Sequence, residues 1–322
     1  MSPATAVDLR VTLSGLELEH PLVDASGTFD LLEIARRFSG DYFAQFPYAA
    51  YVPKTVTADA RTGNPPPRVT ETASGMINAI GLENPGVEAL VEALPALAPL
   101  RQPVIVSVGG NTAGQYAAVV RRLEEALATG GSALPAVAGY ELNVSCPNVG
   151  GGLSIGVDPR ATAEVTVAVR ALTRRLVIVK LTPNVTDVRP VASAAVEAGA
   201  DGLALVNTFR AMVLDPATLR PFLGSRTGGL CGPAIKPIAL RMVAEVAEAL
   251  PKVPLVGMGG VMSGRDALEF IACGATAVAV GAANFTGLEA PRRILDELRA
   301  ECVARGLARV ADARGIALTA GA

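Results

Sequence analysis

The segment Ala136-Val-Ala-Gly-Tyr-Glu-Leu-Asn-Val-Ser-Cys-Pro-Asn148 joins an apolar run to a polar end. The apolar run suits a buried strand, and Pro147 prevents that strand from continuing. At its end lie two carboxamides, Asn143 and Asn148, and the thiol of Cys146. Amides can bind a flat polar heterocycle through paired donors and acceptors, and a thiol can transfer a proton. The segment therefore predicts a strand that carries reactive groups into a ligand site.

Similar apolar runs alternate with amphipathic segments along the chain. Such runs are typical of parallel strands buried on both faces. The eight runs cover residues 21–25, 49–53, 103–108, 140–144, 176–181, 202–206, 254–258 and 275–280. Helical patterns between them cover residues 113–129, 160–173, 188–198, 235–249 and 264–272. Eight strands favour an α/β fold of the closed (β/α)8 TIM barrel type over an open doubly wound sheet. No dinucleotide-binding glycine pattern follows the first run, which also favours the barrel.

The segments outside this alternation also have predicted places. Residues 9–18 read as a β-hairpin around the turn Ser14-Gly15, and we expect this hairpin to plug the bottom of the barrel. Two long connections, 56–85 and 208–233, follow the second and sixth strands on the side where barrel enzymes carry their active sites. No repeat, linker or charge block interrupts the chain, so we expect a single domain over residues 1–322.

Composition excludes several classes of protein. The net charge of −2 over 322 residues offers no electrostatic case for nucleic-acid binding. The single histidine, His20, excludes sites that need several histidines, and we expect it to be structural. Four dispersed cysteines fit neither a disulfide scaffold nor a metal site and indicate a reducing, cytoplasmic setting. We find no stretch long enough to span a membrane and no secretory signal pattern.

Two glycine-rich segments follow the seventh and eighth strands: Val256-Gly-Met-Gly-Gly-Val261 and Val280-Gly-Ala-Ala-Asn284. Glycines allow backbone N–H groups to approach an anion closely, and these loops of a barrel commonly hold a phosphate. The structural alternative is that the glycines only form tight turns between strand and helix. Two such segments at the two expected strand ends favour a phosphate site.

Lys180 ends the fifth apolar run, and Lys54 ends the second. Burial of an unpaired ammonium is costly, so each lysine requires an explanation. It could be a fixed cation beside an electron-rich ring such as a flavin, or a Schiff-base amine. The structural alternative is a lysine whose stem packs on apolar surface while its head joins an ion pair.

Cysteines and carboxamides complete the candidate site. Cys146 lies in a polar loop without a nearby histidine, so it suits a general base better than a histidine-paired nucleophile. We interpret Cys273 and Cys302 as core residues, and expect Cys231 to approach a ligand through its glycine-rich backbone. Four carboxamides, those of residues 78, 143, 148 and 207, belong to three strand ends or their loops and together suit a pyrimidine-like substrate.

The chain resembles the class 1 dihydroorotate dehydrogenases along essentially its whole length. The resemblance rests on Ser74-Gly-Met-Ile-Asn-Ala-Ile-Gly-Leu82, Asn143-Val-Ser-Cys-Pro-Asn148, Val179-Lys-Leu-Thr-Pro-Asn184, Asn207-Thr208, Gly228-Gly-Leu-Cys-Gly-Pro-Ala-Ile-Lys-Pro237 and Gly257-Met-Gly-Gly260. The runs 232–237 and 146–152 resemble class 1B in particular. In that class an electron-transfer subunit carries FAD and a 2Fe–2S cluster, and NAD is the final acceptor. Class 2 members use serine as the base, where this chain has Cys146.

The resemblance implies FMN in the barrel mouth and oxidation of (S)-dihydroorotate to orotate in pyrimidine synthesis. Cys146 would take the C5 proton while C6 passes a hydride to FMN, and Lys54 would be a second catalytic residue. The implied FMN-binding residues are Ser26, Lys54, Thr55, Ser107, Asn143, Lys180, Val206, Gly232, Gly259, Gly260, Gly281 and Ala282. The implied substrate-binding residues are Lys54, Asn78, Ala79, Ile80, Gly81, Leu82, Asn143, Asn148, Asn207 and Thr208. The resemblance also implies a homodimeric core that binds the electron-transfer subunit. It implies no metal site on this chain.

Two departures from the family pattern and several alternatives remain. Ser107 stands where the family usually has asparagine, and Cys231 stands where serine is common, which places an extra oxidisable thiol beside Gly232. The alternatives are a fumarate-reducing homodimer of the class 1A type and a flavin reductase of another dihydropyrimidine. A Schiff-base lyase acting through Lys180 and a non-catalytic ligand-binding barrel are further alternatives.

Overall fold

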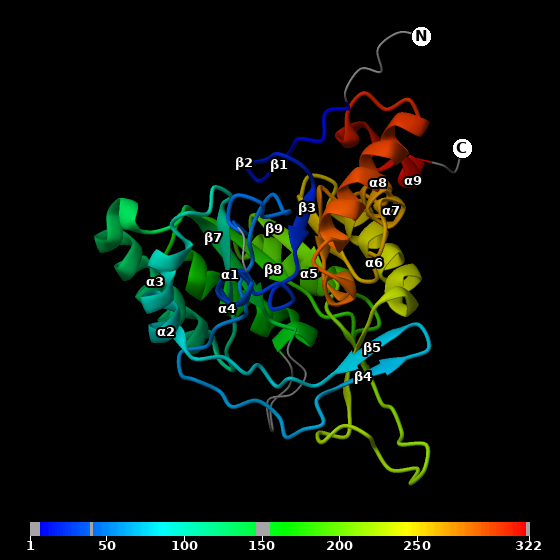
Figure 1. Cartoon of the computed structure of the whole chain (residues 1–322). Helices are drawn as coiled ribbons and strands as arrows, with labels where there is room; N and C mark the ends of the chain where they lie inside the picture. The colour runs from blue at the N-terminus through cyan, green and yellow to red at the C-terminus, as the bar shows by residue number, and fades with distance from the viewer. Residues whose placement is uncertain (1–6, 39–40, 146–154, 320–322) are drawn as a thin grey trace.

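A curved sheet of seven parallel strands forms the centre of the computed structural model, which describes residues 7–38, 41–145 and 155–319 (Figure 1). Its order is β3-β13-β12-β9-β8-β7-β6. The strands are β3 (Leu22–Asp24), β6 (Val104–Val108), β7 (Val137–Asn143), β8 (Leu176–Lys180), β9 (Gly202–Leu205), β12 (Leu255–Met258) and β13 (Ala277–Val280). Nearly all of their residues are buried, as expected of strands covered on both faces.

The predicted second strand closes the barrel without forming a regular strand. Residues 49–56 lie between β3 and β6, the two edges of the sheet. Ala49 N–H donates to the Leu22 carbonyl of β3 at 2.9 Å, and residues 51 and 56 form parallel bridges to β6. Pro53 has no N–H, and the N–H of Val52 donates to the side chain of Asp24 instead of to backbone. The (β/α)8 barrel is therefore confirmed, with one irregular stave.

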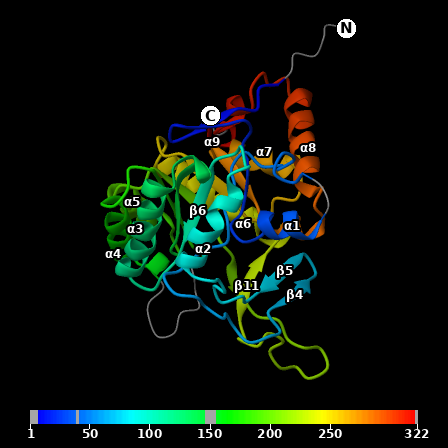
Figure 2. The same ribbon diagram turned by 60° about the vertical axis from the view of Figure 1, so that its left-hand side comes forward.

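Helices surround the barrel and alternate with its strands (Figures 1 and 2). They are α1 (Leu31–Arg37), α2 (Val87–Ala93), α3 (Ala113–Gly130), α4 (Pro159–Arg170), α5 (Arg189–Glu197), α6 (Lys236–Ala249), α7 (Gly264–Ala272), α8 (Ala290–Ala304) and α9 (Ile316–Thr319). Side chains of Thr112, Asp158 and Ser263 cap α3, α4 and α7 by accepting backbone N–H bonds. These caps explain why the predicted starts of those helices agree with the structure to within one residue. No helix in the described part of the chain could cross a membrane.

The predicted hairpin is present as β1 (Val11–Leu13) and β2 (Leu16–Leu18). Its turn residues Ser14 and Gly15 have φ values of 50° and 85°, as a two-residue hairpin turn requires. Ser14 Oγ donates to the carbonyl of Asp201, which immediately precedes β9, at 2.5 Å. The hairpin therefore lies at the amino-terminal ends of the barrel strands, which we call the plug rim.

The two long connections meet in a second, antiparallel sheet at the opposite end of the barrel (Figures 1 and 2). Its order is β10-β11-β5-β4, formed by β4 (Val69–Thr72), β5 (Gly75–Asn78), β10 (Phe209–Ala211) and β11 (Gly228–Cys231). A small separate core of Ile77, Ala79 and Leu223 supports it. The sequence did not predict this sheet, because β5 pairs with β11 across about half of the chain and neither strand is apolar enough to be recognised alone.

Candidate active site

A buried ion pair lies at the carboxyl-terminal ends of the barrel strands, which we call the site rim. Lys180 at the end of β8 places Nζ 3.4 Å from Glu141 Oε1 on β7, with side chains 6% and 7% exposed. The same ammonium lies 3.3 Å from Ser26 Oγ, in the loop after β3. Adjacent strands in register create this pairing, since Asn143 of β7 lies opposite Lys180. The structure thus brings two of the predicted flavin-contacting residues, Lys180 and Ser26, together.

A chain of hydroxyl groups extends from this pair across the barrel. Ser107 Oγ at the end of β6 donates to Glu141 Oε1 at 3.1 Å and lies 2.9 Å from the hydroxyl oxygen of Thr55. Thr55 in turn accepts from Asn143 Nδ2 at 3.2 Å. All four side chains are buried. The serine at position 107 thus links Thr55 to Glu141 through a hydroxyl, where an asparagine would present an amide.

Two of the four predicted carboxamides, those of Asn143 and Asn207, lie close together. Ser145 Oγ donates to Asn143 Oδ1 at 2.7 Å and accepts from Asn207 Nδ2 at 2.5 Å. The hydroxyl of Tyr116 on α3 donates to the Asn143 carbonyl at 2.8 Å. These bonds orient both amides at the site rim. Asn148 and Cys146 lie outside the described residues, so the position of the predicted base stays a prediction.

The small sheet brings further predicted residues to the same end. Asn78 Nδ2 donates to the Gly229 carbonyl at 3.4 Å, and a Cβ on Gly229 would meet the Thr208 side chain. Asn78 and Thr208 therefore flank one strand residue. Leu82 has φ 56°, and its Cδ1 lies 3.6 Å from where a Cβ on Gly109 would stand, close to Thr55.

The loop between Asn78 and Leu82 is held by the segment that precedes β4. Asn64 N–H donates to the Ile80 carbonyl at 3.0 Å, and its side-chain amide donates to the Ala79 carbonyl at 3.0 Å. Gly81, at φ 78°, packs against Asn64, which a Cβ would meet at 2.7 Å. The backbone of the predicted substrate loop is therefore fixed in place.

Lys54 lies at the site rim beside the loop after β3. It is exposed, and a Cβ on Gly27 would come within 2.5 Å of Lys54 Cδ. Gly27 has φ 75° and leaves no room for a Cβ, so glycine is the residue that suits this position. The stem of Lys54 therefore lies one residue from Ser26, while its neighbour Thr55 faces the hydroxyl chain.

Backbone rather than charge defines the other half of the site rim. Gly259, Gly260 and Gly232 have φ values of 123°, 83° and 94°, and a Cβ on Gly260 would meet the Gly232 carbonyl oxygen at 2.7 Å. Within the described residues, the N–H groups of Gly259, Gly260, Gly281 and Ala282 donate to no other group. Because Met258 pairs with Ala279, the two glycine segments begin at the same level of the barrel.

Two further predicted residues border this glycine cradle. Val206 N–H donates to the Met258 carbonyl at 3.0 Å, and the valine side chain lies 3.4 Å from where a Cβ on Gly259 would stand. Gly281 faces Ala25 of the loop after β3, since its Cβ would lie 3.3 Å from Ala25 Cβ. Undonated N–H groups in a glycine cradle suit a phosphate, and a buried ammonium nearby suits an electron-rich ring. The described residues therefore fit FMN.

Three residues of this end were absent from the predicted site. Glu141 and Ser145 connect the ion pair and the amides, and Asp24 is a buried carboxyl at the end of β3. A charged residue inside an apolar strand pattern was the available signal for Glu141 and Asp24, since buried charge needs a partner. Ser145 offered no signal beyond its neighbours.

The other cysteines lie on β11, just after α7 and in the core. Burial raises the pKa of Cys231 to about 11, and its Sγ lies 3.5 Å from the Met76 carbonyl. A thiol with this pKa is a poor nucleophile at neutral pH, which agrees with a backbone role for this segment. Cys302 is buried in the core and Cys273 is half-buried at the end of α7.

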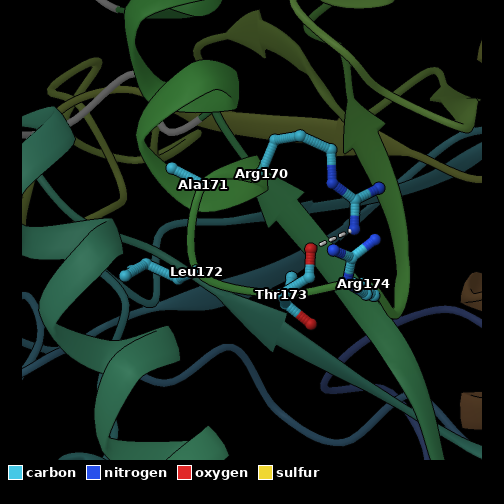
Figure 3. A pocket seen from close by; sticks show the side chains of 5 residues that line it. All are labelled: Arg170, Ala171, Leu172, Thr173 and Arg174. Carbon is cyan, nitrogen blue, oxygen red and sulfur yellow. Dashed lines mark hydrogen bonds between the residues drawn. The ribbon is translucent and has the colours of Figure 1, made fainter.

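A surface hollow lined by residues 170–174 lies at the plug rim, away from all of these groups (Figure 3). Its Arg170 is engaged by Asp201 at 2.7 Å and by the carbonyls of Thr173 and Arg175. The hollow therefore lies over the connection between α4 and β8, at the end of the barrel opposite the site rim.

The fold and this site define a barrel enzyme with a ligand site at the carboxyl-terminal ends of its strands. A sequence profile described as dihydroorotate dehydrogenase matches residues 8–302, and the chain belongs to that family. Similar proteins include "Dihydroorotate dehydrogenase B (NAD(+)), catalytic subunit" of Desulforudis audaxviator, 46% identical over 97% of this chain and 98% of that protein. The protein of the same name from Pelobacter propionicus is 46% identical over 96% of this chain and 98% of its own.

A solved structure supports the fold. The crystal structure of DHODH from Eimeria tenella in complex with ferulenol superposes with a TM-score of 0.78 at 23% identity. The match covers 97% of this chain and 89% of the other. At this identity the likeness supports the barrel and its topology.

Proposed function

We propose that this protein oxidises (S)-dihydroorotate to orotate as the catalytic subunit of a B-type dihydroorotate dehydrogenase. The observation that carries the proposal is the junction at the site rim of the Lys180–Glu141 pair, the Asn143 and Asn207 amides and the glycine cradle. The family of the chain and the names of its relatives supply the substrate.

The residues of the chain divide the work between binding and proton transfer. The N–H groups of Gly259, Gly260, Gly281 and Ala282 would hold the phosphate of FMN. Lys180, fixed by Glu141, would place a positive charge beside the flavin ring. When bound, FMN supplies the acceptor for the hydride that leaves C6 of dihydroorotate.

The remaining groups would act on the substrate. Asn143 and Asn207 would present oriented amides to the planar ring, and the ammonium of Lys54 would pair with an anionic group of the substrate. Cys146 would take the C5 proton, so that loss of a proton and a hydride leaves the C5=C6 double bond. Ser26, Thr55, Ser107, Val206 and Gly232 would border the flavin, and residues 78–82, Asn148 and Thr208 the substrate.

The test is anaerobic mixing of the FMN-loaded protein with dihydroorotate. We expect the flavin to bleach with dihydroorotate and not with dihydrouracil. Cys146→Ala should slow bleaching by about 10²-fold or more. Cys273→Ala, which removes the thiol just after the end of α7, serves as the control and should bleach at the normal rate. Normal bleaching by Cys146→Ala would contradict the base assignment, and no bleaching by dihydroorotate in the unaltered protein would contradict the function.

The final acceptor separates the remaining alternatives. The proposal includes a homodimeric core, a partner subunit with FAD and a 2Fe–2S cluster, a cytoplasmic location, and NAD as acceptor. Re-oxidation by NAD through a co-purifying subunit supports it, whereas direct re-oxidation by fumarate would place the protein with class 1A. A Schiff-base role for Lys180 is disfavoured, since an ammonium held by Glu141 at 3.4 Å is a poor nucleophile.

A further inference from the structure

Asp24 is a buried carboxyl group whose two oxygens have very different surroundings. It ends β3 and is 1% exposed. Its Oδ1 accepts the N–H of Val52 at 2.6 Å. Its Oδ2 is buried and has no hydrogen-bond partner among the described residues, where two other buried side-chain oxygens, of Gln102 and Thr276, share this state. Of the three, Asp24 alone is titratable.

The charges around Asp24 do not balance an ionised carboxylate. Glu141 on β7 and Lys180 on β8 are the charged groups that face it, and these two already pair with each other at 3.4 Å. Tyr48 and Tyr51, from the segment beside β3, also face it, and burial raises the pKa of both phenols. One ammonium thus serves two carboxyl groups, and Lys180 is the partner of Glu141. Burial, followed by the charge of Glu141, raises the pKa of Asp24 well above its ordinary value, although the Val52 N–H opposes the shift.

The Oδ1 atom of Asp24 holds residues 49–56, the segment that closes the barrel without forming a regular strand. Ala49 still pairs with the β3 backbone, but Val52 pairs with the Asp24 side chain, and Pro53 can donate nothing. Lys54 and Thr55 follow immediately. The stem of Lys54 packs against Gly27, three residues after Asp24, so the two segments are in contact at Val52 and again at Lys54.

We propose that Asp24 is a positioning residue that acts as an uncharged acid, anchoring Val52 so that Lys54 and Thr55 are held at the site rim while Glu141 remains the single anion facing Lys180. An ionised Asp24 would compete for the ammonium that Glu141 holds. An apolar side chain would release the Val52 N–H into a buried position without an acceptor. The part that concerns Lys54 rests on the proposed function, and the protonation state does not.

The protonation state is tested on the protein without substrate, by thermal unfolding of wild type and Asp24→Asn at several pH values. A carboxyl whose pKa is raised by folding keeps its proton in the native state, so the contribution of Asp24 to the stability of the wild type is lost as pH rises from about 4. Asparagine keeps the Val52 acceptor and cannot ionise. Its Tm advantage over wild type should therefore grow with rising pH. Asp296→Asn, an exposed carboxylate on α8, should show no such trend.

An infrared spectrum gives a second readout of the same state. The wild type at neutral pH should show the carbonyl stretch of a protonated carboxylic acid, and Asp24→Asn should lack it. A band that persists in Asp24→Asn, or a Tm of Asp24→Asn below that of wild type at neutral pH, would overturn the uncharged assignment. Neither result depends on whether dihydroorotate is the substrate.

The positioning role is tested by comparing KM and kcat of two variants. Asp24→Asn should keep KM for dihydroorotate within about threefold, whereas Asp24→Ala should raise it about tenfold or more, because the Val52 anchor is lost. An equal rise in KM in the two variants, or no rise in either, would overturn the role. If Asp24→Ala does not fold, Asp24→Ser, whose hydroxyl is one bond shorter than the Asp24 carboxyl and so also loses the Val52 anchor, replaces it with the same expectation. A protein that bleaches with no dihydropyrimidine would refute the proposed function and leave the pH and infrared results standing.

Discussion

Each rim of the barrel contains a carboxylate with several polar neighbours, half-buried Glu124 at the plug rim and buried Glu141 at the site rim, and their hydrogen bonds differ. At the plug rim Glu124 Oε1 accepts from the Tyr140 hydroxyl at 2.9 Å, the Thr173 hydroxyl at 2.6 Å and Arg175 Nε at 3.2 Å. At the site rim Glu141 Oε1 has the longer contacts to Ser107 at 3.1 Å and Lys180 at 3.4 Å. Nearby, the Asp24 oxygen and the cradle N–H groups have no partner among the described residues.

The difference shows where the chain gives up stability for function. Hydrogen bonds left unmade in the folded protein cost free energy unless a ligand completes them. At the plug rim the Glu124 carboxylate is bonded within the protein and so contributes to folding, although the buried side-chain oxygens of Gln102 and Thr276, just before β6 and β13, have no partner among the described residues. The site rim retains donors and a cation that suit an anionic, aromatic ligand. Changes at the site rim should therefore affect binding and turnover, and changes at the plug rim should affect stability.

The largest expected effect comes from the cation of the site rim. Lys180→Ala should slow flavin reduction by dihydroorotate by about 10²-fold or more, because a fixed charge beside the ring is lost. Stopped-flow bleaching of the FMN-loaded variant measures this rate. Lys252→Ala, an exposed lysine, is the control. A Lys180→Ala protein that purifies fully yellow and bleaches normally would remove the distinction between the rims.

The next effect comes from the glycine cradle. Gly260→Ala should weaken FMN binding by about tenfold or more, because a Cβ would meet the Gly232 carbonyl oxygen at 2.7 Å and φ is 83°. Gly306→Ala is a matched control, since φ is 67° but nothing lies within 4 Å of the added Cβ. Titration of the apoproteins with FMN compares the two. Equal FMN affinity in both variants would show that the cradle does not hold the phosphate.

The smallest effect is a pH dependence at the plug rim. Burial lowers the pKa of His20 to about 4, and its neutral Nδ1 accepts the Leu22 N–H at 3.3 Å. Between about pH 6.5 and 4 the unfolded chain binds the His20 proton more readily, so the contribution of His20 to stability falls as pH falls through this window. His20→Asn keeps an acceptor and cannot ionise, so its free energy of unfolding should fall by about 1–2 kcal/mol less over this range. The free energies of unfolding are measured with denaturant at several pH values. Equal changes with pH in the two proteins would refute this role.

Much of the barrel was predictable because its code is local. A short apolar run followed by a capped amphipathic helix repeats along the chain, and each repeat needs no distant partner to be recognised. Seven of the eight predicted strands became regular strands, and the stave at 49–56 did not, because Pro53 and Asp24 replace its ladder. That the chain is a single domain remains a prediction.

The candidate site was predictable in its members more than in its connections. Lys180, Asn143 and the glycine segments stand at strand ends, and parallel strands bring all such ends to one rim. Glu141 and Asp24 were missed because a sequence pattern does not tell a buried carboxyl with a partner from one without. The pairing of β5 with β11 was missed for a related reason, since it joins segments far apart in the chain.

By itself the sequence determined the alternation of strands and helices, the plug hairpin, the family and the residue types available at the strand ends. These follow from side-chain period, turn chemistry and composition, which are properties of short segments. The tertiary structure alone decided which carboxyl shares the ammonium of Lys180, which N–H groups stay open, and how the last stave closes the barrel. Those outcomes depend on distances between atoms from different strands, and only the closed barrel sets them.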